Sequence, residues 1–381
     1  MKKVLIMSGE ASGDLHGANL ARELRKADPT LMLYGVGSRE MRNAGIELLA
    51  DASEISVVGI TAVLTHFRKI YRVYAKLKRF LKHERPDILV LIDFPDFNIM
   101  LGKAAQKLGI PVVYYISPQV WVWRKGRIQT IARLVKAMLV AFPFEVPLYE
   151  QAGVDVRFVG HPLVDIVRSD LTQEQAKKLF NIEPAHRVVA LLPGSRRSEI
   201  VHLLPDMLSA ARILKHRHTD LRFLLPIAPT LDSSFVRAFI ESSGIPVRMV
   251  EGRSYDVLRA SDAALVASGT ATLETGLMNV PMAIAYRISP LNYFIMTKLV
   301  RNVEHVGLVN IVAGKRIVPE LVQNDSTPEA MADAVNRILA DPAYAQQVKN
   351  DLARMRDRLG DAGASRRAAA VVGEFLMQAG K

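Results

Sequence analysis

A continuous apolar run at residues 88–92, Ile-Leu-Val-Leu-Ile, constrains the fold more than any other stretch of this chain. Polar and apolar residues do not alternate in it, which is typical of a parallel strand covered on both faces. The run stops at Asp93 and Asp96, and Pro95 between them cannot continue a strand because it has no N–H. Ligands of parallel α/β sheets bind beyond the carboxyl ends of the strands. The stretch therefore predicts either a reaction site or a helix capped by carboxylates.

One unit recurs along the 381 residues: a short β-branched run, a polar or glycine-containing loop, and an amphipathic stretch. This alternation predicts parallel sheets, and the length suits about two domains of roughly 100 to 200 residues each. The tripeptide Gly-His-Pro at 160–162 breaks the pattern, which restarts at Val188. We therefore expect a first domain at residues 1–162 and a second at residues 163–344.

Composition narrows the class of partner. Lys and Arg outnumber Asp and Glu by 50 to 38, and the formal charge of +12 favours an anionic partner, whether nucleic acid, phosphorylated metabolite or lipid surface. Because the chain has no cysteine and its nine histidines are scattered, neither a disulfide nor a metal site is indicated. Only residues 4–7 form an apolar run near Met1, and no stretch approaches the roughly 20 apolar residues of a spanning helix. We expect a cytoplasmic protein whose membrane contact, if any, is peripheral.

The strand predicted at residues 4–7 leads into a loop that reads GEASGD at residues 9–14. Its glycines have the spacing G-x-x-x-G, which is not that of a dinucleotide fingerprint, and no acid ends a second strand about 20 residues later, so no nicotinamide cofactor is expected. The two glycines allow a ligand to approach the backbone closely. Polar contacts to that ligand are expected from Glu10, Ser12 and Asp14.

Residues 55–83 contain seven Lys or Arg side chains and no acid, and apolar residues recur among them at helical spacing. A helix lying in an anionic membrane interface has this pattern. A helix that packs on the sheet with a basic outer face shows the same pattern. The tyrosines favour the membrane interface. The side chains expected at a membrane are Val63, Phe67, Arg68, Lys69, Ile70, Arg72 and Tyr74.

Both tryptophans of the chain follow the strand predicted at residues 111–116. Trp121 and Trp123 lie close to Gln119 and to three basic residues, so they can form the wall of a pocket for a bulky anionic ligand. Ordinary packing in the core is the alternative for either ring.

The second half begins with a strand at residues 188–192, followed by a loop that contains Gly194, Ser195 and Arg196 and then by an amphipathic helix. Backbone N–H groups and the dipole at a helix N-terminus attract a phosphate, and Arg196 can grip it with two hydrogen bonds. A purely structural turn is the alternative.

A similar loop contains Ser268, Gly269 and Thr270, and Glu274 follows one turn into the next helix. An acid at this place can accept hydrogen bonds from a ribose diol, or it can merely complement the helix dipole. Together the two loops predict a nucleoside diphosphate site in the second domain.

Seven motifs, taken in chain order, resemble those of the lipid-A-disaccharide synthase family. They are GEASGD at 9–14, DFPDFN at 93–98, SPQVWVWR at 117–124, GHP at 160–162, LLPGSR at 191–196, SGTATLE at 268–274 and YR at 286–287. One departure is Val309, because the family pattern has Leu-Pro before the residue matched by Asn310.

The resemblance implies an α/β fold of the GT-B type, in which two Rossmann-like parallel-sheet domains face a central cleft. Helices at about residues 345–381 would then pack on the first domain or on a partner's, and the sequence does not choose between a monomer and a homodimer. It also implies an inverting, metal-independent transferase without a cofactor, bound to the cytoplasmic face of the inner membrane. Such an enzyme joins UDP-2,3-diacylglucosamine to 2,3-diacylglucosamine 1-phosphate, releases UDP and binds no nucleic acid.

The resemblance also assigns roles to residues. Asp96 is expected to be the general base, and Arg196 to stabilise the departing diphosphate. Asp93 would orient the loop, while Arg287 and Asn310 would make secondary contacts to the donor. Two rivals stay open: a GT-B transferase that uses unacylated UDP-GlcNAc and a lipid-linked acceptor, and a non-catalytic protein that binds anionic ligands.

Overall fold

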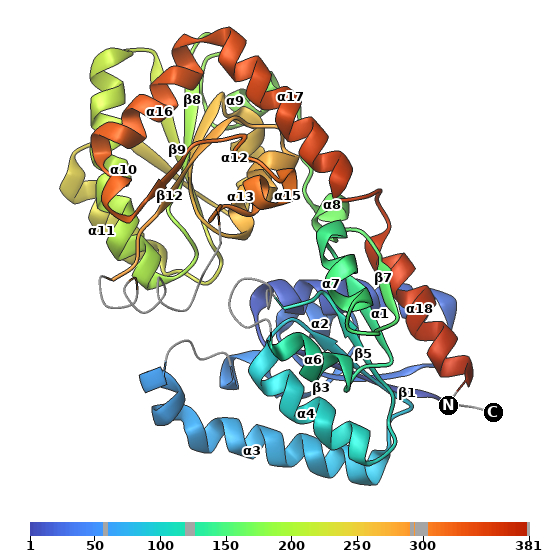
Figure 1. The fold of residues 1–381 in the computed structure, drawn as a ribbon. Coiled ribbons are helices and arrows are strands. Elements are labelled where there is room, and N and C mark those ends of the chain that lie inside the picture. Colours follow the sequence, from blue (N-terminus) through green and yellow to red (C-terminus); the bar gives the residue numbers. More distant parts are fainter. Residues whose placement is uncertain (56–59, 119–125, 290–292, 294–303, 379–381) are drawn as a thin grey trace. The chain divides into compact units, whose positions relative to one another are not determined.

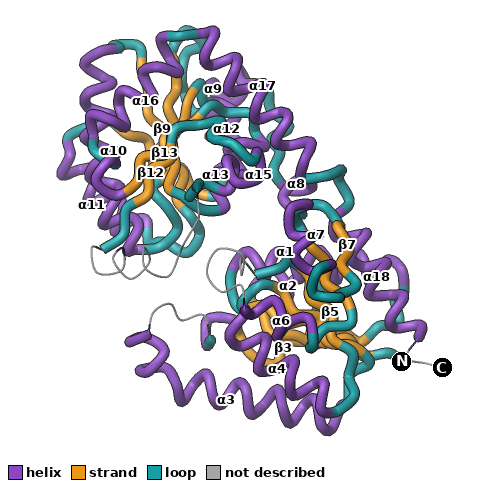
Figure 2. Tube along the Cα trace, in the orientation of Figure 1, coloured by secondary structure: helices purple, strands orange, loops and turns teal. Residues whose placement is uncertain are grey.

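The computed structural model describes residues 1–55, 60–118, 126–289, 293 and 304–378 (Figure 1). The chain divides into two compact units, one made of Met1–Pro162 with Leu359–Lys381 and the other of Leu163–Arg358. Each unit contains one parallel sheet with helices packed against it (Figure 2).

The first unit is built on a seven-stranded sheet with the order β3-β2-β1-β4-β5-β6-β7. Neighbouring strands pair in parallel, and β1 lies between β2 and β4. The strands are β1 (Lys3–Ser8), β2 (Met32–Gly37), β3 (Glu47–Asp51), β4 (Ile88–Ile92), β5 (Val112–Tyr115), β6 (Ala137–Val140) and β7 (Val156–Phe158).

The strand predicted at residues 88–92 is β4, and all five of its side chains are buried. Successive side chains of a strand point to opposite faces, so Leu89 and Leu91 join one hydrophobic cluster while Val90 and Ile92 join another. Both faces of the sheet are therefore covered, which explains why the run does not alternate.

Helices and short 3-10 turns cover this sheet. They are α1 (Ala11–Ala27), α2 (Arg39–Asn43), η1 (Ala52–Glu54), α3 (Ile60–Glu84), α4 (Pro95–Lys107), α6 (Gly126–Ala132), η2 (Pro143–Glu145), α7 (Val146–Glu150) and α18 (Ala364–Gln378). Helix α3 packs against α4, and α1 packs against α18.

The second unit is built on a six-stranded parallel sheet with the order β10-β9-β8-β11-β12-β13. Its strands are β8 (Arg187–Leu192), β9 (Leu221–Ile227), β10 (Val247–Glu251), β11 (Ala263–Ala267), β12 (Met282–Tyr286) and β13 (Glu320–Val322). Its helices are α8 (Leu163–Ile166), α9 (Gln173–Leu179), α10 (Arg197–Arg217), α11 (Ser233–Ser243), α12 (Ser254–Ala260), α13 (Thr270–Leu277), α15 (Leu308–Ala313), η3 (Gln323–Asp325), α16 (Pro328–Ala340) and α17 (Pro342–Arg358).

The C-terminal return to the first unit comes at Leu359, later than the expected position near residue 345. Helix α17 stays with the second unit because Leu352 and Met355 are buried on its inner side, where it packs against α13 and α15. Helix α18 makes the return, and its Ala368 and Val372 share a hydrophobic cluster with α1.

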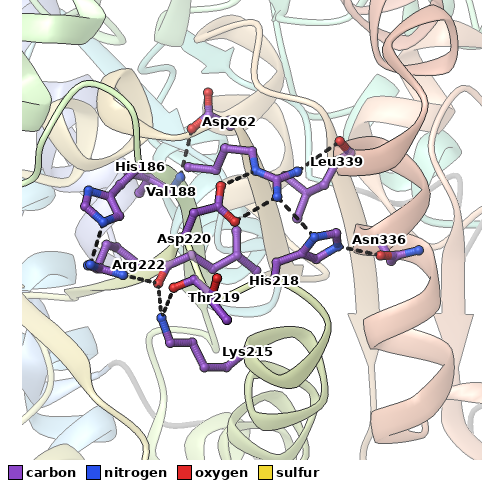
Figure 3. A network of polar contacts seen from close by, with 12 residues as sticks. His186, Val188, Lys215, His218, Thr219, Asp220, Arg222, Asp262, Asn336 and Leu339 are labelled. Carbon is purple, nitrogen blue, oxygen red and sulfur yellow. Dashed lines mark hydrogen bonds and ion pairs between the residues drawn. The ribbon is translucent and has the colours of Figure 1, made fainter.

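A polar network ties the amino ends of β8 and β9 to α16 (Figure 3). The Arg187 guanidinium donates to both oxygens of Asp220, at 2.7 and 2.9 Å. His218 bridges the same guanidinium and the Asn336 side chain, with contacts of 3.0 and 2.7 Å. Since these charges lie at the amino edge of the sheet, they stabilise the end opposite to the one at which ligands bind in such folds.

Candidate active site

Each sheet has one place at which the strand order reverses. In the first unit it lies between β1 and β4, and in the second between β8 and β11. Ligands of open α/β sheets bind beyond the carboxyl ends of the strands at such a switch point. The loops predicted from sequence follow these four strands, so the structure brings residues 9–14 beside 93–96 and residues 193–196 beside 268–269.

The turn after β4 has an unusual backbone. Asp93 and Phe94 are consecutive non-glycine residues with φ of 43° and 45°, a left-handed conformation that needs support from its surroundings. The Asn98 side chain donates to the carbonyl oxygens of Ile92 and Asp93, at 3.1 and 2.7 Å. The Tyr114 hydroxyl also donates to the Asp93 carbonyl, at 2.5 Å. These bonds fix the direction in which the Asp93 carboxyl leaves the strand.

The loop after β1 packs directly on this turn. A Cβ at Gly9 would lie 2.3 Å from the Phe94 ring, so any larger residue there would displace that ring. The contact holds Glu10, the residue that precedes α1, close enough to Asp93 for their charges to interact.

The Asp93 carboxyl has a raised pKa. Burial first, and the Glu10 charge second, raise the pKa of Asp93 from 3.8 to about 6, although a hydrogen bond from the Phe94 N–H opposes the change. A carboxylate with a pKa near the working pH is suited to accept a proton in catalysis.

Asp96 lies in a different environment. It occupies the first turn of α4, its side chain is 81% exposed, and it forms an ion pair with Arg127 of α6. The two acids are three residues apart in the chain, but only Asp93 is partly buried beside another carboxylate.

Asp14, the last residue of the motif at 9–14, has a structural role. Its buried carboxylate accepts hydrogen bonds from the backbone N–H groups of Ser38, Glu40 and Met41, at 2.5, 2.9 and 3.3 Å, and so caps α2. Ser12 is exposed in the first turn of α1. Gln119, Trp121 and Trp123, expected to contact the acceptor, lie outside the described residues.

Helix α3 has one of the two arrangements expected for residues 55–83, that of a helix packed in the core with a basic outer face. Val73, Leu77 and Leu81 are buried, and Ile70 and Tyr74 pack against the same cluster, so one face belongs to the core. On the outer side lie the exposed residues Arg68, Lys69, Tyr71 and Arg72. The side chains of Val63 and Phe67 are outside the described part. Among the described residues, no helix combines the length and apolar character needed to cross a membrane.

The loop after β8 already encloses an anion. The Glu199 carboxylate accepts hydrogen bonds from the backbone N–H groups of Ser195 and Arg196, at 2.7 and 3.2 Å, and contacts the Arg196 guanidinium at 3.5 Å. Gly194 has a φ of 119°, and a Cβ there would lie 2.2 Å from a Glu199 oxygen. The donors expected to hold a phosphate thus converge on one negatively charged group.

Sequence reasoning did not single out Glu199. Its signal is its position, because an acid three residues after the residue that caps a helix commonly reaches back to the cap. Arg196 is the capping residue of α10, and Glu199 follows at this spacing.

The loop after β8 is occupied by the Glu199 carboxylate, whereas the space beside Gly269 in the loop after β11 is open. Gly269 has a φ of 150°, which favours glycine, and a Cβ there would meet nothing within 4 Å. Ser268 donates to the Val306 carbonyl at 2.7 Å, and Thr270 is exposed at the start of α13. Glu274 accepts a hydrogen bond from the Tyr255 hydroxyl at 3.0 Å, and burial raises the pKa of its carboxyl.

Arg287 and Asn310 were expected to touch the donor, but both are engaged inside the second unit. Arg287 forms an ion pair with Asp206 and donates to the Ser326 carbonyl. Asn310 is fully buried, and its amide makes four hydrogen bonds, two donated and two accepted, to residues 317–320. An asparagine amide has no further capacity of this kind, so the geometry gives Asn310 a structural role.

Comparison with known proteins identifies the family. A model described as "Lipid-A-disaccharide synthetase" matches residues 4–374. The chain belongs to the lipid-A-disaccharide synthase family. The lipid-A-disaccharide synthase of Geobacter metallireducens is 48% identical over 375 residues, covering 98% of this chain and 97% of the relative. That of Myxococcus xanthus is 44% identical over 374 residues, with 98% and 97% covered.

Solved structures agree on the fold. The UDP-GlcNAc 2-epimerase of Neisseria meningitidis matches with a TM-score of 0.63 at 13% identity, covering 99% of this chain and 100% of that one. MurG of Acinetobacter baumannii matches with a TM-score of 0.61 at 14% identity, covering 98% and 100%. The predicted fold class, GT-B with two parallel α/β units, is confirmed. Membership of the family also confirms an enzyme of glycosyl transfer in lipid A biosynthesis and sets the two rival functions aside.

Proposed function

We propose that the chain transfers 2,3-diacylglucosamine from its UDP conjugate to 2,3-diacylglucosamine 1-phosphate, with inversion at the anomeric carbon and with Asp93 as the general base. The observation that carries this proposal is the pair of switch points. One presents a carboxyl whose pKa is raised to about 6, and the other presents backbone donors and an arginine that converge on an anion.

Donor binding is assigned to the second unit. Ser195, Arg196 and Gly194 would hold the diphosphate, and Ser268, Gly269 and Thr270 would line its other side. Glu274 would accept a hydrogen bond from the ribose. Two fold neighbours support a UDP site, since one is described as bound to UDP-GlcNAc and another, MnaA of S. aureus, as a co-structure with UDP.

The general base is assigned to Asp93 and not to Asp96, in contrast to the expectation from sequence. A sugar hydroxyl is a weak nucleophile, so the base must accept its proton as the oxygen attacks the anomeric carbon. The raised pKa suits Asp93 to accept that proton, whereas Asp96 is exposed and forms an ion pair with Arg127. Glu10 contributes by keeping Asp93 basic.

The departing group is stabilised by the second unit. As the bond from the anomeric carbon to the diphosphate breaks, negative charge grows on the phosphate oxygen. The N–H groups of Ser195 and Arg196 and the Arg196 guanidinium are placed to bind that charge once Glu199 has moved away. A single displacement of this kind inverts the anomeric centre and needs no covalent intermediate.

A mass-spectrometric assay with acylated donor and acceptor tests the reaction. We expect the disaccharide 1-phosphate and UDP in equal amounts, and no product from UDP-GlcNAc that lacks the acyl chains. Product from the unacylated donor at a comparable rate would contradict the assignment of substrate. Asp93→Asn should lower kcat by roughly 100-fold or more, while Asp96→Asn should retain most of the activity.

We also propose that the enzyme binds peripherally to the cytoplasmic face of the inner membrane through α3. Its outer side carries Arg68, Lys69 and Arg72, all exposed, and Tyr71 with a 60% exposed side chain. Replacing the three cations with Gln should weaken binding to anionic vesicles and leave the thermal unfolding temperature unchanged, because none of them belongs to the core. Unchanged vesicle binding would contradict this attachment.

A further inference from the structure

A groove of 460 Å³ lies between α3 and α4 on the first unit. Lys78 and Lys82, one turn apart on α3, line one side, and Lys103 and Lys107, one turn apart on α4, line the other. We call it the lysine groove. All four lysines are exposed, and none of the residues that line the groove is acidic.

The positive charge of the lysine groove is not neutralised by its own helices. Helix α3 has one acid, Glu84, which pairs with Lys3 at 2.8 Å, and α4 has one, Asp96, which pairs with Arg127. Within the described parts of the chain, none of the four lysines forms an ion pair. Like charges one turn apart repel each other, so an anion in the groove would relieve this repulsion.

The rest of the groove is apolar. Tyr74, Met100 and Ala104 line it, and the Met100 side chain is 45% exposed. The Tyr74 ring is held by an edge-on contact with Phe97, with ring centroids 6.1 Å apart. A ligand that was only a phosphate would leave this apolar surface in water, whereas an acyl chain would cover it.

We propose that the lysine groove binds one anionic membrane phospholipid, with its phosphate between the four lysines and the start of an acyl chain on Met100 and Ala104. Clusters of lysine next to apolar surface are the usual means by which proteins recognise such lipids. This inference deepens the proposed membrane attachment of α3 and rests on it.

The groove is separate from the transfer site. Lys103 and Lys107 come seven and eleven residues after Asp96, which is roughly 10 to 17 Å along α4 at a rise of about 1.5 Å per residue. The acceptor carries its phosphate on the same sugar ring as the reacting hydroxyl. A phosphate in the groove therefore belongs to a different molecule from an acceptor engaged at Asp93.

Vesicle binding of the full-length chain tests the site. The probes are vesicles of phosphatidylcholine alone and with 20 mol% phosphatidylglycerol, at fixed salt. The test variant is Lys103→Gln with Lys107→Gln, and the matched control is Lys136→Gln with Lys178→Gln, two exposed lysines outside the groove. We expect the Kd for the anionic vesicles to rise roughly tenfold or more in the test variant and less than twofold in the control.

A soluble lipid separates a specific site from diffuse attraction. Dihexanoyl phosphatidylglycerol below its micelle concentration should bind the native chain with one-to-one stoichiometry. Met100→Gln should weaken that binding, and inorganic phosphate should compete only weakly. Two results would overturn the proposal: an equal loss of affinity for anionic vesicles in the test and control variants, or competition by inorganic phosphate as strong as that by the lipid.

The outcomes also separate the lysine groove from the proposed transfer reaction and from the proposed membrane attachment through α3. If the native chain binds neither kind of vesicle, both the membrane attachment and the lysine groove fail. If anionic vesicles bind the native chain and the groove variant alike, only the groove fails. The groove variant should keep its transfer rate on substrates dispersed in detergent, because neither lysine touches the reacting groups.

Discussion

Asp93→Asn gives the sharpest test of the active site, because it changes charge and leaves shape almost untouched. Asparagine tolerates the left-handed backbone at this position, where φ is 43°. The difference between a pKa of about 6 and the ordinary 3.8 corresponds to roughly 3 kcal/mol, at about 1.36 kcal/mol per pKa unit. This is the free energy by which the fold disfavours the ionised carboxyl.

The sign of the effect on stability follows from this raised pKa. Below about pH 3.8 the carboxyl is protonated in both the folded and the unfolded chain, and the full stability is present. As the pH rises from about 3.8 to about 6 the unfolded carboxyl ionises while the folded one keeps its proton, and that contribution is lost. Asparagine cannot ionise, so the variant should become more stable than the native chain by up to roughly 3 kcal/mol at pH 8, with the difference vanishing near pH 4.

Two measurements check the reasoning. Urea unfolding at several pH values should show this gain, and kcat/KM of the native enzyme should fall tenfold per pH unit below about pH 6. The variant should lose roughly 100-fold to 10,000-fold in kcat, the usual contribution of a general base, while its affinity for UDP stays the same. A variant that keeps activity within tenfold of the native enzyme, or that gains no stability at pH 8, would refute the assignment.

Three further substitutions probe the surrounding structure. Glu199→Gln should tighten UDP binding about tenfold in calorimetry, because a charged competitor for two N–H groups is removed; unchanged or weaker binding would contradict the displacement of Glu199. Asn310→Ala should lower the free energy of unfolding by roughly 2 to 4 kcal/mol in urea, and a loss below about 1 kcal/mol would argue against its buried network. Gly9→Ala should displace the Phe94 ring and reduce kcat at least tenfold in a folded protein, so full activity would show that this contact does not position Asp93.

Strands β1, β4, β5 and β8 were predictable because the continuous apolar run of a buried parallel strand is visible in the local sequence. Residues 88–92 are apolar without alternation, and this pattern depends on burial of both faces and on nothing distant in sequence. The loops at the carboxyl ends of β1, β4, β8 and β11 were predictable for the same reason. Their meeting in two pairs follows from the strand order, which periodicity alone does not determine.

The roles of individual polar residues were less predictable. Asp93 and Asp96 look alike in sequence, and they differ only because Glu10 lies beside one and Arg127 beside the other. Asp14 was expected to face a ligand, but it caps a helix that begins 25 residues later. Each of these outcomes depends on a contact between segments that are far apart in the chain.

The path of the chain through its two units affects the order in which they can complete folding during synthesis. The second unit is one uninterrupted segment, Leu163–Arg358, whereas the first needs α18 to cover α1. A ribosome that has made the strands of the first unit has not yet made Ala368 or Val372, which close that side of the sheet. The second unit can therefore complete its core first. Until α18 emerges, the apolar surface of α1 stays uncovered and is prone to aggregation.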